Sequence, residues 1–155
     1  MIHVLFVCLG NICRSPMAEA VFRDLVKREG LEDKIVIDSA GTGNWHVGHP
    51  PHQGTRKTLT QHQISFEGMV ARQITEADLS HFDYIIAMDQ QNEMDIINLN
   101  STMPKQTNIH KLLDLTKEHQ GKDVPDPYYT GNFDEVFQLV THGCEKLLQK
   151  IKAEL

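Results

Sequence analysis

Short runs of apolar residues alternate with longer segments of helical periodicity along this chain. The apolar runs are too short for independent helices and are bounded by polar or turn-forming residues, which is typical of buried strands. They predict four strands, at Ile2–Val7, Ile35–Ala40, Tyr84–Met88 and Ile109–Leu113.

Amphipathic segments between and after these strands predict helices. Apolar residues recur at helical spacing within Met17–Val26 and again within Val136–Ile151. Ser15 is a candidate N-cap, and Pro16 suits the first helical position, so the first helix is expected to begin there. Further helices are predicted after Pro50-Pro51 to about Gln63, from Thr75, after Asp89 to about Ile97, and from about Phe133 to Lys152.

Alternating strands and helices favour an α/β fold in which helices cover both faces of a parallel sheet. The 155 residues match one ordinary domain, and neither a linker nor an internal repeat divides them. In such sheets ligands bind at the carboxyl ends of the strands. The segment that follows the first strand is therefore the first place to look for a binding site.

Composition and charge exclude some classes of function. The chain is 40% hydrophobic, enough for one core, but its apolar runs fall short of the roughly 20 residues that cross a bilayer. A net charge of −6 with scattered basic residues argues against nucleic acid binding. The N-terminal residues show no secretory signal, so we expect a cytoplasmic protein that acts away from the membrane.

The segment between the first strand and the first helix has the composition of an anion-binding loop. It runs Cys-Leu-Gly-Asn-Ile-Cys-Arg from Cys8 to Arg14. Gly10 lets the backbone curl tightly, and Asn11 tolerates a left-handed conformation. The helix N-terminus near Ser15 adds free amides, and the planar guanidinium of Arg14 matches two phosphate oxygens. The same positive surroundings favour a thiolate at Cys8, which would be a nucleophile aimed at phosphorus.

Two other interpretations of this loop compete with catalysis. An inert buried cysteine would be the first choice for a lone Cys8 at a strand end, and a nucleotide-binding P-loop would lack its Gly-Lys-Ser/Thr ending. Neither explains why cysteine, glycine, arginine and serine are combined between a strand and a helix. The three cysteines Cys8, Cys13 and Cys144 do not indicate a disulfide framework.

A second candidate for chemistry lies near the end of the chain. Asp126 stands between Pro125 and Pro127, which restrict the local backbone, so its carboxyl group could be held over the loop as a proton donor. Tyr128 and Tyr129 follow and would suit the wall of a pocket for an aromatic ring. Taken alone, Asp-Pro-Tyr would more often be a structural turn with a capping aspartate.

Together these residues resemble a known family, the low-molecular-weight protein tyrosine phosphatases. The similarity begins with the segment from Cys8 to Pro16 and ends with Asp126-Pro127-Tyr128-Tyr129. Between them, matching stretches occur in order at Met17–Ala20, Asp38–Thr42, Gly48 with Pro50-Pro51, Val70–Ile74, Phe82–Ile85 and Met88-Asp89. The resemblance covers nearly the whole chain. It implies one domain over residues 1–155 with a four-stranded parallel sheet, and a hydrolase that needs neither metal nor other cofactor.

The resemblance also implies roles for individual residues. Cys8 would be the nucleophile that forms a phosphocysteine, Arg14 the phosphate clamp, and Asp126 the general acid and then base. Ser39 would support the loop together with Asn11 and Ser15, and Ser15 would also hydrogen-bond the sulfur. The implied substrate-binding residues are Leu9, Gly10, Asn11, Ile12, Cys13, Ser15, Trp45, Tyr128 and Tyr129. Cys13 resembles a second loop cysteine that can form a protective disulfide with Cys8.

One position departs from the family pattern. Many animal members carry a histidine just before the Val-Ala-Arg stretch, where this chain has Met69 next to Val70. The support of Asn11 is therefore expected to differ in detail. His46, His49 and His52 are spaced by three, but the intervening glycine and prolines forbid a regular helix, so we expect no metal site there.

Phosphotyrosine in proteins or peptides, and small aryl phosphates, are the expected substrates. Inorganic phosphate and other oxyanions are expected to inhibit, and the protein is expected to be a monomer with at most weak self-association. Arsenate reduction would need more cysteines than Cys144 beyond the loop. Bacterial protein arginine phosphatases tend to have threonine where Ile12 stands and lack the paired tyrosines. The alternatives that stay open are an arginine phosphatase and a non-catalytic module that binds phosphate or senses redox state.

Overall fold

The sheet has four strands, all parallel. The structure is a computed structural model that describes residues 1–99 and 108–155. The strands are β1 (Ile2–Cys8), β2 (Ile35–Gly41), β3 (Tyr84–Ala87) and β4 (Asn108–Lys111), in the spatial order β2-β1-β3-β4. The strand order reverses between the central strands β1 and β3, which places a topological switch point at their carboxyl ends.

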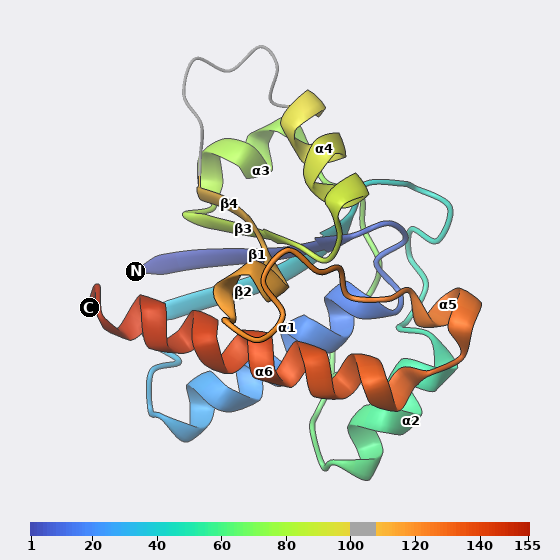
Figure 1. The fold of residues 1–155 in the computed structure, drawn as a ribbon, viewed down its shortest axis with the longest axis horizontal. Coiled ribbons are helices and arrows are strands. Elements are labelled where there is room, and N and C mark those ends of the chain that lie inside the picture. Colours follow the sequence, from blue (N-terminus) through green and yellow to red (C-terminus); the bar gives the residue numbers. More distant parts are fainter. Residues whose placement is uncertain (100–107) are drawn as a thin grey trace.

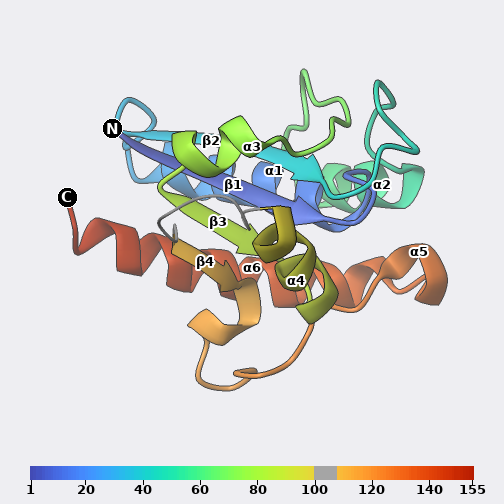
Figure 2. The same cartoon turned by 90° about the horizontal axis from the view of Figure 1, so that it is seen from above.

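Helices cover both faces of this sheet (Figures 1 and 2). The helices are α1 (Arg14–Arg28), α2 (Gln53–Gln61), α3 (Glu76–His81), α4 (Gln90–Leu99), α5 (Pro127–Thr130) and α6 (Phe133–Lys152). Helices α1, α2 and α6 lie on one side, and α3 and α4 lie on the other (Figure 1). The predicted α/β class, with its parallel sheet and two covered faces, is confirmed. None of the helices in the described part of the chain is long and apolar enough to cross a bilayer.

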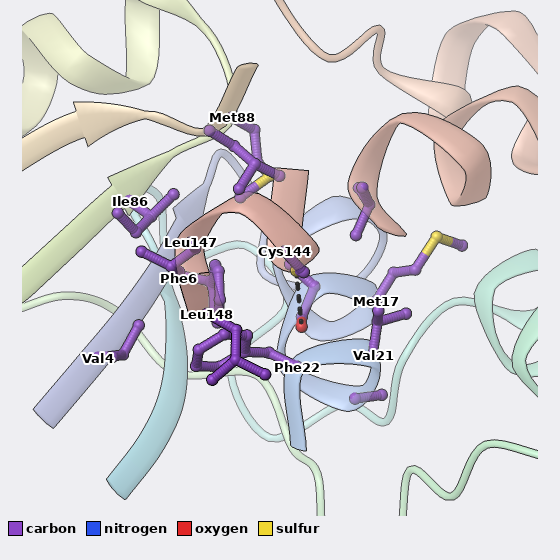
Figure 3. Close-up of a cluster of buried hydrophobic side chains, with 14 of the residues drawn as sticks. Val4, Phe6, Met17, Val21, Phe22, Ile86, Met88, Cys144, Leu147 and Leu148 are labelled. Atoms are coloured by element: carbon purple, nitrogen blue, oxygen red, sulfur yellow. Dashed lines mark hydrogen bonds between the residues drawn. The ribbon is translucent and has the colours of Figure 1, made fainter. Parts of the chain in front are cut away.

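Strand β1 is buried on both sides, which explains its nearly continuous apolar run. Val4 and Phe6 belong to the core shared with α1 and α6, whereas Leu5 and Val7 belong to the core under α3 and α4. Figure 3 shows part of the first core, where Phe6, Phe22, Leu147 and Leu148 lie together beside Cys144. Successive side chains of β1 therefore point into two different cores.

Cys144 is a structural cysteine in this first core. Its sulfur donates to the backbone oxygen of Ala18 on α1 over 3.7 Å (Figure 3). Burial raises the pKa of the Cys144 thiol above its ordinary value, and the charge of Glu145 adds to this effect. Cys144 therefore stays a protonated, packed side chain far from any nucleophilic role.

The first helix begins earlier than the sequence predicted. Helix α1 starts at Arg14, and its N-cap Cys13 makes no capping hydrogen bond through its side chain. Ser15 does not cap the helix because its hydroxyl is engaged with Cys8 and Asn11. The prediction that Ser15 caps and that Pro16 opens the helix was wrong, and the amides of the first turn keep no side-chain partner.

Two further segments differ in kind from what the sequence predicts. Strand β4 ends at Lys111, and the residues predicted to complete it form a 3₁₀ helix over Leu112–Leu115 that turns the chain toward α6. The segment of Tyr128 and Tyr129 was predicted to be neither helix nor strand. It is the short helix α5, which Asp126 caps by accepting from the Tyr128 amide over 3.0 Å.

Truncation of a core side chain on α6 tests the packing of this helix against the sheet. Leu147 is fully buried. Leu147→Ala should lower the free energy of unfolding by about 2–5 kcal/mol, the usual cost of removing a buried leucine side chain. Urea denaturation followed by circular dichroism measures this change. Gln149→Ala, at an exposed position of the same helix, should stay within about 0.5 kcal/mol of the wild type, and an equal loss in both variants would contradict the assignment.

Candidate active site

The loop between β1 and α1 lies at the topological switch point of the sheet. It leaves the carboxyl end of β1 at Cys8 and enters α1 at Arg14. Within the described residues, no backbone amide from Leu9 to Ser15 donates to a protein acceptor. Free amides in a curled loop, followed by a helix N-terminus, form an anion-binding site.

Gly41 at the end of β2 allows the loop to pass close to the sheet. A Cβ atom at this position would lie 2.8 Å from the carbonyl oxygen of Leu9, a backbone atom that cannot yield. The amides of Thr42 and Gly43 donate to the carbonyl oxygens of Cys8 and Leu9, each over 2.9 Å. These bonds attach the start of the loop to the chain that leaves β2.

Asn11 holds the middle of the loop in its curled shape. Its φ of 56° is left-handed, as predicted, and its side chain is 2% exposed. Its Nδ2 donates to the hydroxyls of Ser15 (2.8 Å) and Ser39 (3.0 Å). Its Oδ1 accepts from the backbone amide of Arg72 over 3.0 Å. Each hydrogen bond of the Asn11 side chain thus ties the loop to a different segment of the fold.

The Arg72 amide is the support that the sequence did not reveal. Met69, which stands where many animal relatives have a histidine, packs instead against the apolar core. Arg72 is held by its own ion pairs to Asp38 (3.0 Å) and Asp78 (2.9 Å). Asn11 is thus supported by a backbone donor that no side-chain pattern could have indicated, and the expected difference from animal relatives stays a prediction.

Ser15 connects this network to the sulfur of Cys8. Its Oγ lies 3.0 Å from Cys8 Sγ, and both atoms are buried. The side chains of Ser15 and Asn11 do not line the pocket described below, although they were predicted as substrate-binding residues. They lie behind the loop with Ser39 and support its shape.

Arg14 is buried among negative groups. Its guanidinium donates to Asp89 (2.6 Å), to the carbonyl oxygen of Val124 (3.0 Å) and to Asp126 (3.4 Å). Burial lowers the pKa of Arg14, but the negative charges of the Cys8 thiolate and of its two carboxylate partners outweigh it and raise the pKa above the ordinary value. Arg14 is thus a fixed cation beside the sulfur.

Asp89 is a site residue to which the sequence analysis gave no role. It follows β3, whose carboxyl end lies beside that of β1, and there it orients Arg14. The signal that could have found it is an acidic residue directly after a buried strand neighbouring the loop. Its position in the matching Met88-Asp89 pair was noted, but a pairing with Arg14 depends on strand order.

The residue that follows β3 also fixes the position of Asp126. The Val124 amide donates to the carbonyl oxygen of Met88 over 2.9 Å, which brings the Pro125–Pro127 segment over the loop. One carboxylate oxygen of Asp126 caps α5, and the other faces Arg14. Asp126 is therefore both the capping aspartate of the structural interpretation and a member of the site.

Most of the predicted catalytic and substrate-binding residues converge on one pocket of about 210 Å³. Its lining includes Cys8, Leu9, Gly10, Ile12, Cys13, Arg14, Trp45, His46, Asp126, Tyr128 and Tyr129. The aromatic members form its outer wall, since Trp45 is 68% and Tyr129 77% exposed. His46 was not predicted as a lining residue. Its ring would lie 3.1 Å from a Cβ atom at Gly10, so it closes the pocket beside the loop.

Cys13 differs from Cys8 although both line the pocket. Burial raises the pKa of Cys13 to about 12, and the nearby charges of Cys8 and Asp126 add to this effect. Neither Cys8 nor Cys13 forms a disulfide in the structure. The disulfide between Cys8 and Cys13 stays a prediction.

The three spaced histidines lie near one another around Tyr128, with the rings of His46 and His49 5.8 Å apart, but they have different roles. His46 lies in the pocket wall, His52 stacks on Phe133 and caps α2 by accepting from the Gly54 amide, and His49 is exposed. Among residues 1–99 and 108–155, no group of three or more histidine, cysteine or acidic side chains is arranged to hold a metal ion.

A buried cysteine beside a fixed arginine, in a loop of free amides and below a carboxyl group, defines a phosphatase that uses a cysteine nucleophile. Comparison with known proteins identifies the class. Residues 3–155 match the model of the family described as "Low molecular weight phosphotyrosine protein phosphatase", and the chain belongs to this family.

Individual relatives are similar over almost their whole length. The low molecular weight protein-tyrosine-phosphatase YfkJ of Bacillus subtilis is 57% identical over 154 residues, which cover 99% of this chain and 98% of that protein. Its crystal structure aligns with a TM-score of 0.95 over 99% of this chain and 96% of that one. An arginine phosphatase from Drosophila is 35% identical, with a TM-score of 0.87 over 96% and 97% of the two chains.

The environments of the three cysteines predict selective alkylation. At pH 7 a pKa of about 12 leaves roughly one Cys13 in 10⁵ as thiolate, and Cys144 is buried in the core. Iodoacetamide should therefore modify Cys8 first, since it lines the open pocket beside Arg14. Peptide mapping by mass spectrometry measures the three rates, and inorganic phosphate should protect Cys8. Faster labelling of Cys13, or no protection, would contradict this view of the pocket.

Proposed function

We propose that the protein hydrolyses phosphotyrosine in proteins, and small aryl phosphates, through a phosphocysteine intermediate on Cys8. The observation that carries the proposal is that Cys8, Arg14 and Asp126 line the same pocket, which aromatic side chains enclose. The substrates of this family are phosphoproteins, and phosphotyrosine is the finer assignment that the pocket supports best.

The phosphate dianion binds to the loop amides and to Arg14. In the structure the Asp126 carboxylate contacts the Arg14 guanidinium. The phosphate dianion faces the same guanidinium and takes over part of this ion pairing. Tyr128 and Tyr129 flank the aryl group of the substrate, where apolar ring faces favour a planar ring. The loop amides stabilise the charge on the three oxygens of the transferring group, which is the main requirement of phosphoryl transfer.

In the first step the Cys8 thiolate attacks phosphorus in line with the tyrosyl oxygen. The S–P bond forms while the P–O bond to tyrosine breaks, and Asp126 in its acid form gives its proton to the leaving oxygen. The products of this step are free tyrosine on the protein and a phosphocysteine. Asp126 is left as a carboxylate.

In the second step Asp126 acts as a base. It takes a proton from water, the water oxygen attacks phosphorus, and the S–P bond breaks to return the Cys8 thiolate. Ser15, whose hydroxyl lies 3.0 Å from the sulfur, stabilises this leaving thiolate. Phosphate leaves, and no metal ion takes part in either step.

Phosphoarginine is the second candidate substrate, because a solved relative at 35% identity is titled an arginine phosphatase. The apolar Ile12 in the loop and the two tyrosines at the rim favour an aryl group over a guanidinium. Both substrates would use the same nucleophile, so only a direct comparison of turnover separates them.

Further properties belong to the same proposal. Phosphate and other tetrahedral oxyanions should inhibit competitively, since they fit the same amides. The protein acts as a monomer in the cytoplasm, and oxidation would join Cys8 to Cys13 in a reversible disulfide.

Substitution of the nucleophile tests the phosphatase function. Cys8→Ser should abolish phosphate release from a phosphotyrosine peptide, because serine is not ionised near neutral pH, whereas the wild type should turn over with a chelator present. Phosphate release is measured for the wild type and for Cys8→Ser, with the chelator present. Absence of turnover by the wild type would leave the non-catalytic module as the alternative, and faster release from a phosphoarginine peptide would favour the second candidate.

The role of Asp126 is tested through the leaving group. Asp126→Asn keeps an oxygen that can cap α5 but cannot donate a proton. Turnover of a phosphotyrosine peptide should fall by about 10²–10⁴-fold. Dinitrophenyl phosphate, whose leaving phenolate needs no proton, should be affected far less in burst kinetics of the first step. An equal loss with both substrates would contradict the role of Asp126 as general acid.

A further inference from the structure

Glu19 is a buried acidic residue that the proposed mechanism does not use. It lies on α1, is only 7% exposed, and accepts at Oε1 from the hydroxyl of Ser39 over 2.6 Å. Among residues 1–99 and 108–155, its other oxygen has a single long contact, 3.5 Å, to the guanidinium of Arg23. A buried carboxyl group with one short hydrogen bond needs an explanation, because its burial alone is unfavourable.

The hydrogen bond to Glu19 is the end of a chain that reaches the catalytic sulfur. Ser39 accepts from Asn11, Asn11 donates also to Ser15, and Ser15 contacts Cys8 Sγ. The donor–acceptor distances along this chain lie between 2.6 and 3.0 Å. Glu19 is thus joined to the reacting atom through three intervening side chains.

The direction of each hydrogen bond in this chain follows from two groups, the Arg72 amide and the Glu19 carboxyl oxygen. The backbone amide of Arg72 can only donate, so the atom of Asn11 that it meets is the oxygen, and the Asn11 nitrogen faces both serines. Ser39 accepts from that nitrogen, so its own proton goes to Glu19. Ser15 likewise accepts from Asn11, so its own proton can be donated to the sulfur of Cys8.

The competing acceptor for the Ser15 proton is weaker. The carbonyl oxygen of Ala40 lies 3.5 Å from Ser15 Oγ, whereas Cys8 Sγ lies at 3.0 Å, a short distance for a sulfur acceptor. A thiolate in this position is the stronger acceptor, because hydrogen bonds to ionised groups are the stronger class. The proton of Ser15 therefore points at the nucleophile.

We propose that Glu19 is a positioning residue of the active site, which accepts from Ser39, thereby holds Asn11 in place, and through Asn11 keeps the Ser15 hydroxyl on the Cys8 sulfur. This inference rests on the proposed function only in that both take the Cys8 thiolate as the nucleophile. Without an acceptor at Glu19, the Ser39 proton has no partner among the described contacts of its hydroxyl. Ser39 would then reorient, and the bonds of Asn11 to the two serines would loosen.

Glu19 acts in this role through its acceptor oxygen Oε1 and not through its negative charge. Burial raises the pKa of Glu19, while the Ser39 hydrogen bond and the charge of Arg23 oppose the rise, and Asp38 and Arg72 act at longer range with opposite signs. A carboxyl group protonated on Oε2 still accepts at Oε1, so the direction of the chain survives protonation. A glutamine, which also presents an oxygen, should therefore replace Glu19, and a leucine should not.

The rate at which iodoacetamide alkylates Cys8, measured across pH, tests this proposal without requiring turnover. In Glu19→Leu the rate profile should shift to higher pH, and at mildly acidic pH the rate should fall about 10-fold, the size of one lost hydrogen bond to a charged atom. Glu19→Gln should stay within about threefold of the wild type. If only the negative charge of Glu19 mattered, its loss would favour the Cys8 thiolate, and the rate profile would shift to lower pH.

Turnover of a phosphotyrosine peptide gives a second measurement. The kcat of Glu19→Leu should fall about 10-fold while KM changes by less than about threefold, since the Ser15 bond acts on the sulfur. Asp24→Leu is the matched control. Asp24 lies on the same helix and pairs with Arg28 at the surface, away from the chain of bonds.

A double-mutant cycle separates this role from a loss of folding. Ser39→Ala alone should shift the alkylation profile in the same direction, and adding Glu19→Leu to it should cause no further shift. If Glu19→Leu does not fold, Ser39→Ala carries the test by itself. An unchanged profile in a folded Glu19→Leu or Ser39→Ala, or equal effects of Gln and Leu at position 19, would overturn the proposal. A wild type that alkylates as expected but releases no phosphate would refute the proposed function and leave this inference standing.

Discussion

The loop after β1 keeps its backbone amides free of protein acceptors, and the surrounding structure compensates for this. An unpaired buried donor costs about 1–3 kcal/mol, so a run of them is unstable unless other contacts hold it. Asn11, in a left-handed conformation, supplies these contacts through the hydroxyls of Ser15 and Ser39 and the amide of Arg72. The result is a rigid anion-binding loop whose donors are available to a ligand.

Local charge decides the chemistry of this site against the sign of the whole molecule. The protein carries a net charge of −6, yet the site is organised around a buried guanidinium. Arg14 is flanked by Asp89 and Asp126, so its charge is balanced and fixed before any substrate arrives. A phosphate dianion can then use the free amides, which are positive only at short range.

The supporting network gives the sulfur more than a fixed position. Because each link has only one consistent donor and one acceptor, the direction of the last hydrogen bond is set by groups far from the pocket. Glu19 lies at the end of this arrangement remote from the sulfur, and the Arg72 amide fixes the orientation of Asn11 in its middle. A site of this kind can keep its loop unchanged while its electrostatics depend on residues that never touch the substrate.

The sequence alone determined the alternation of strands and helices, the position of the loop, and the residue types that meet in it. Apolar periodicity is a local property, so β1, α1 and α6 could be predicted closely from it. Cys8 and Arg14 could be chosen because few other roles combine these residues with a strand, a glycine and a helix start, whereas Asp126 could be chosen only through the resemblance to the family. The early start of α1, by contrast, depends on the hydroxyl of Ser15 being used elsewhere.

Only the tertiary structure decided which distant groups complete the site. Asp89 reaches Arg14 because β3 lies beside β1, and Arg72 reaches Asn11 through its backbone, which carries no side-chain signal. The role of Glu19 likewise depends on the direction of hydrogen bonds between three segments. Pairing between strands and the direction of hydrogen bonds are properties of the packed molecule, so no pattern along the chain could have specified them.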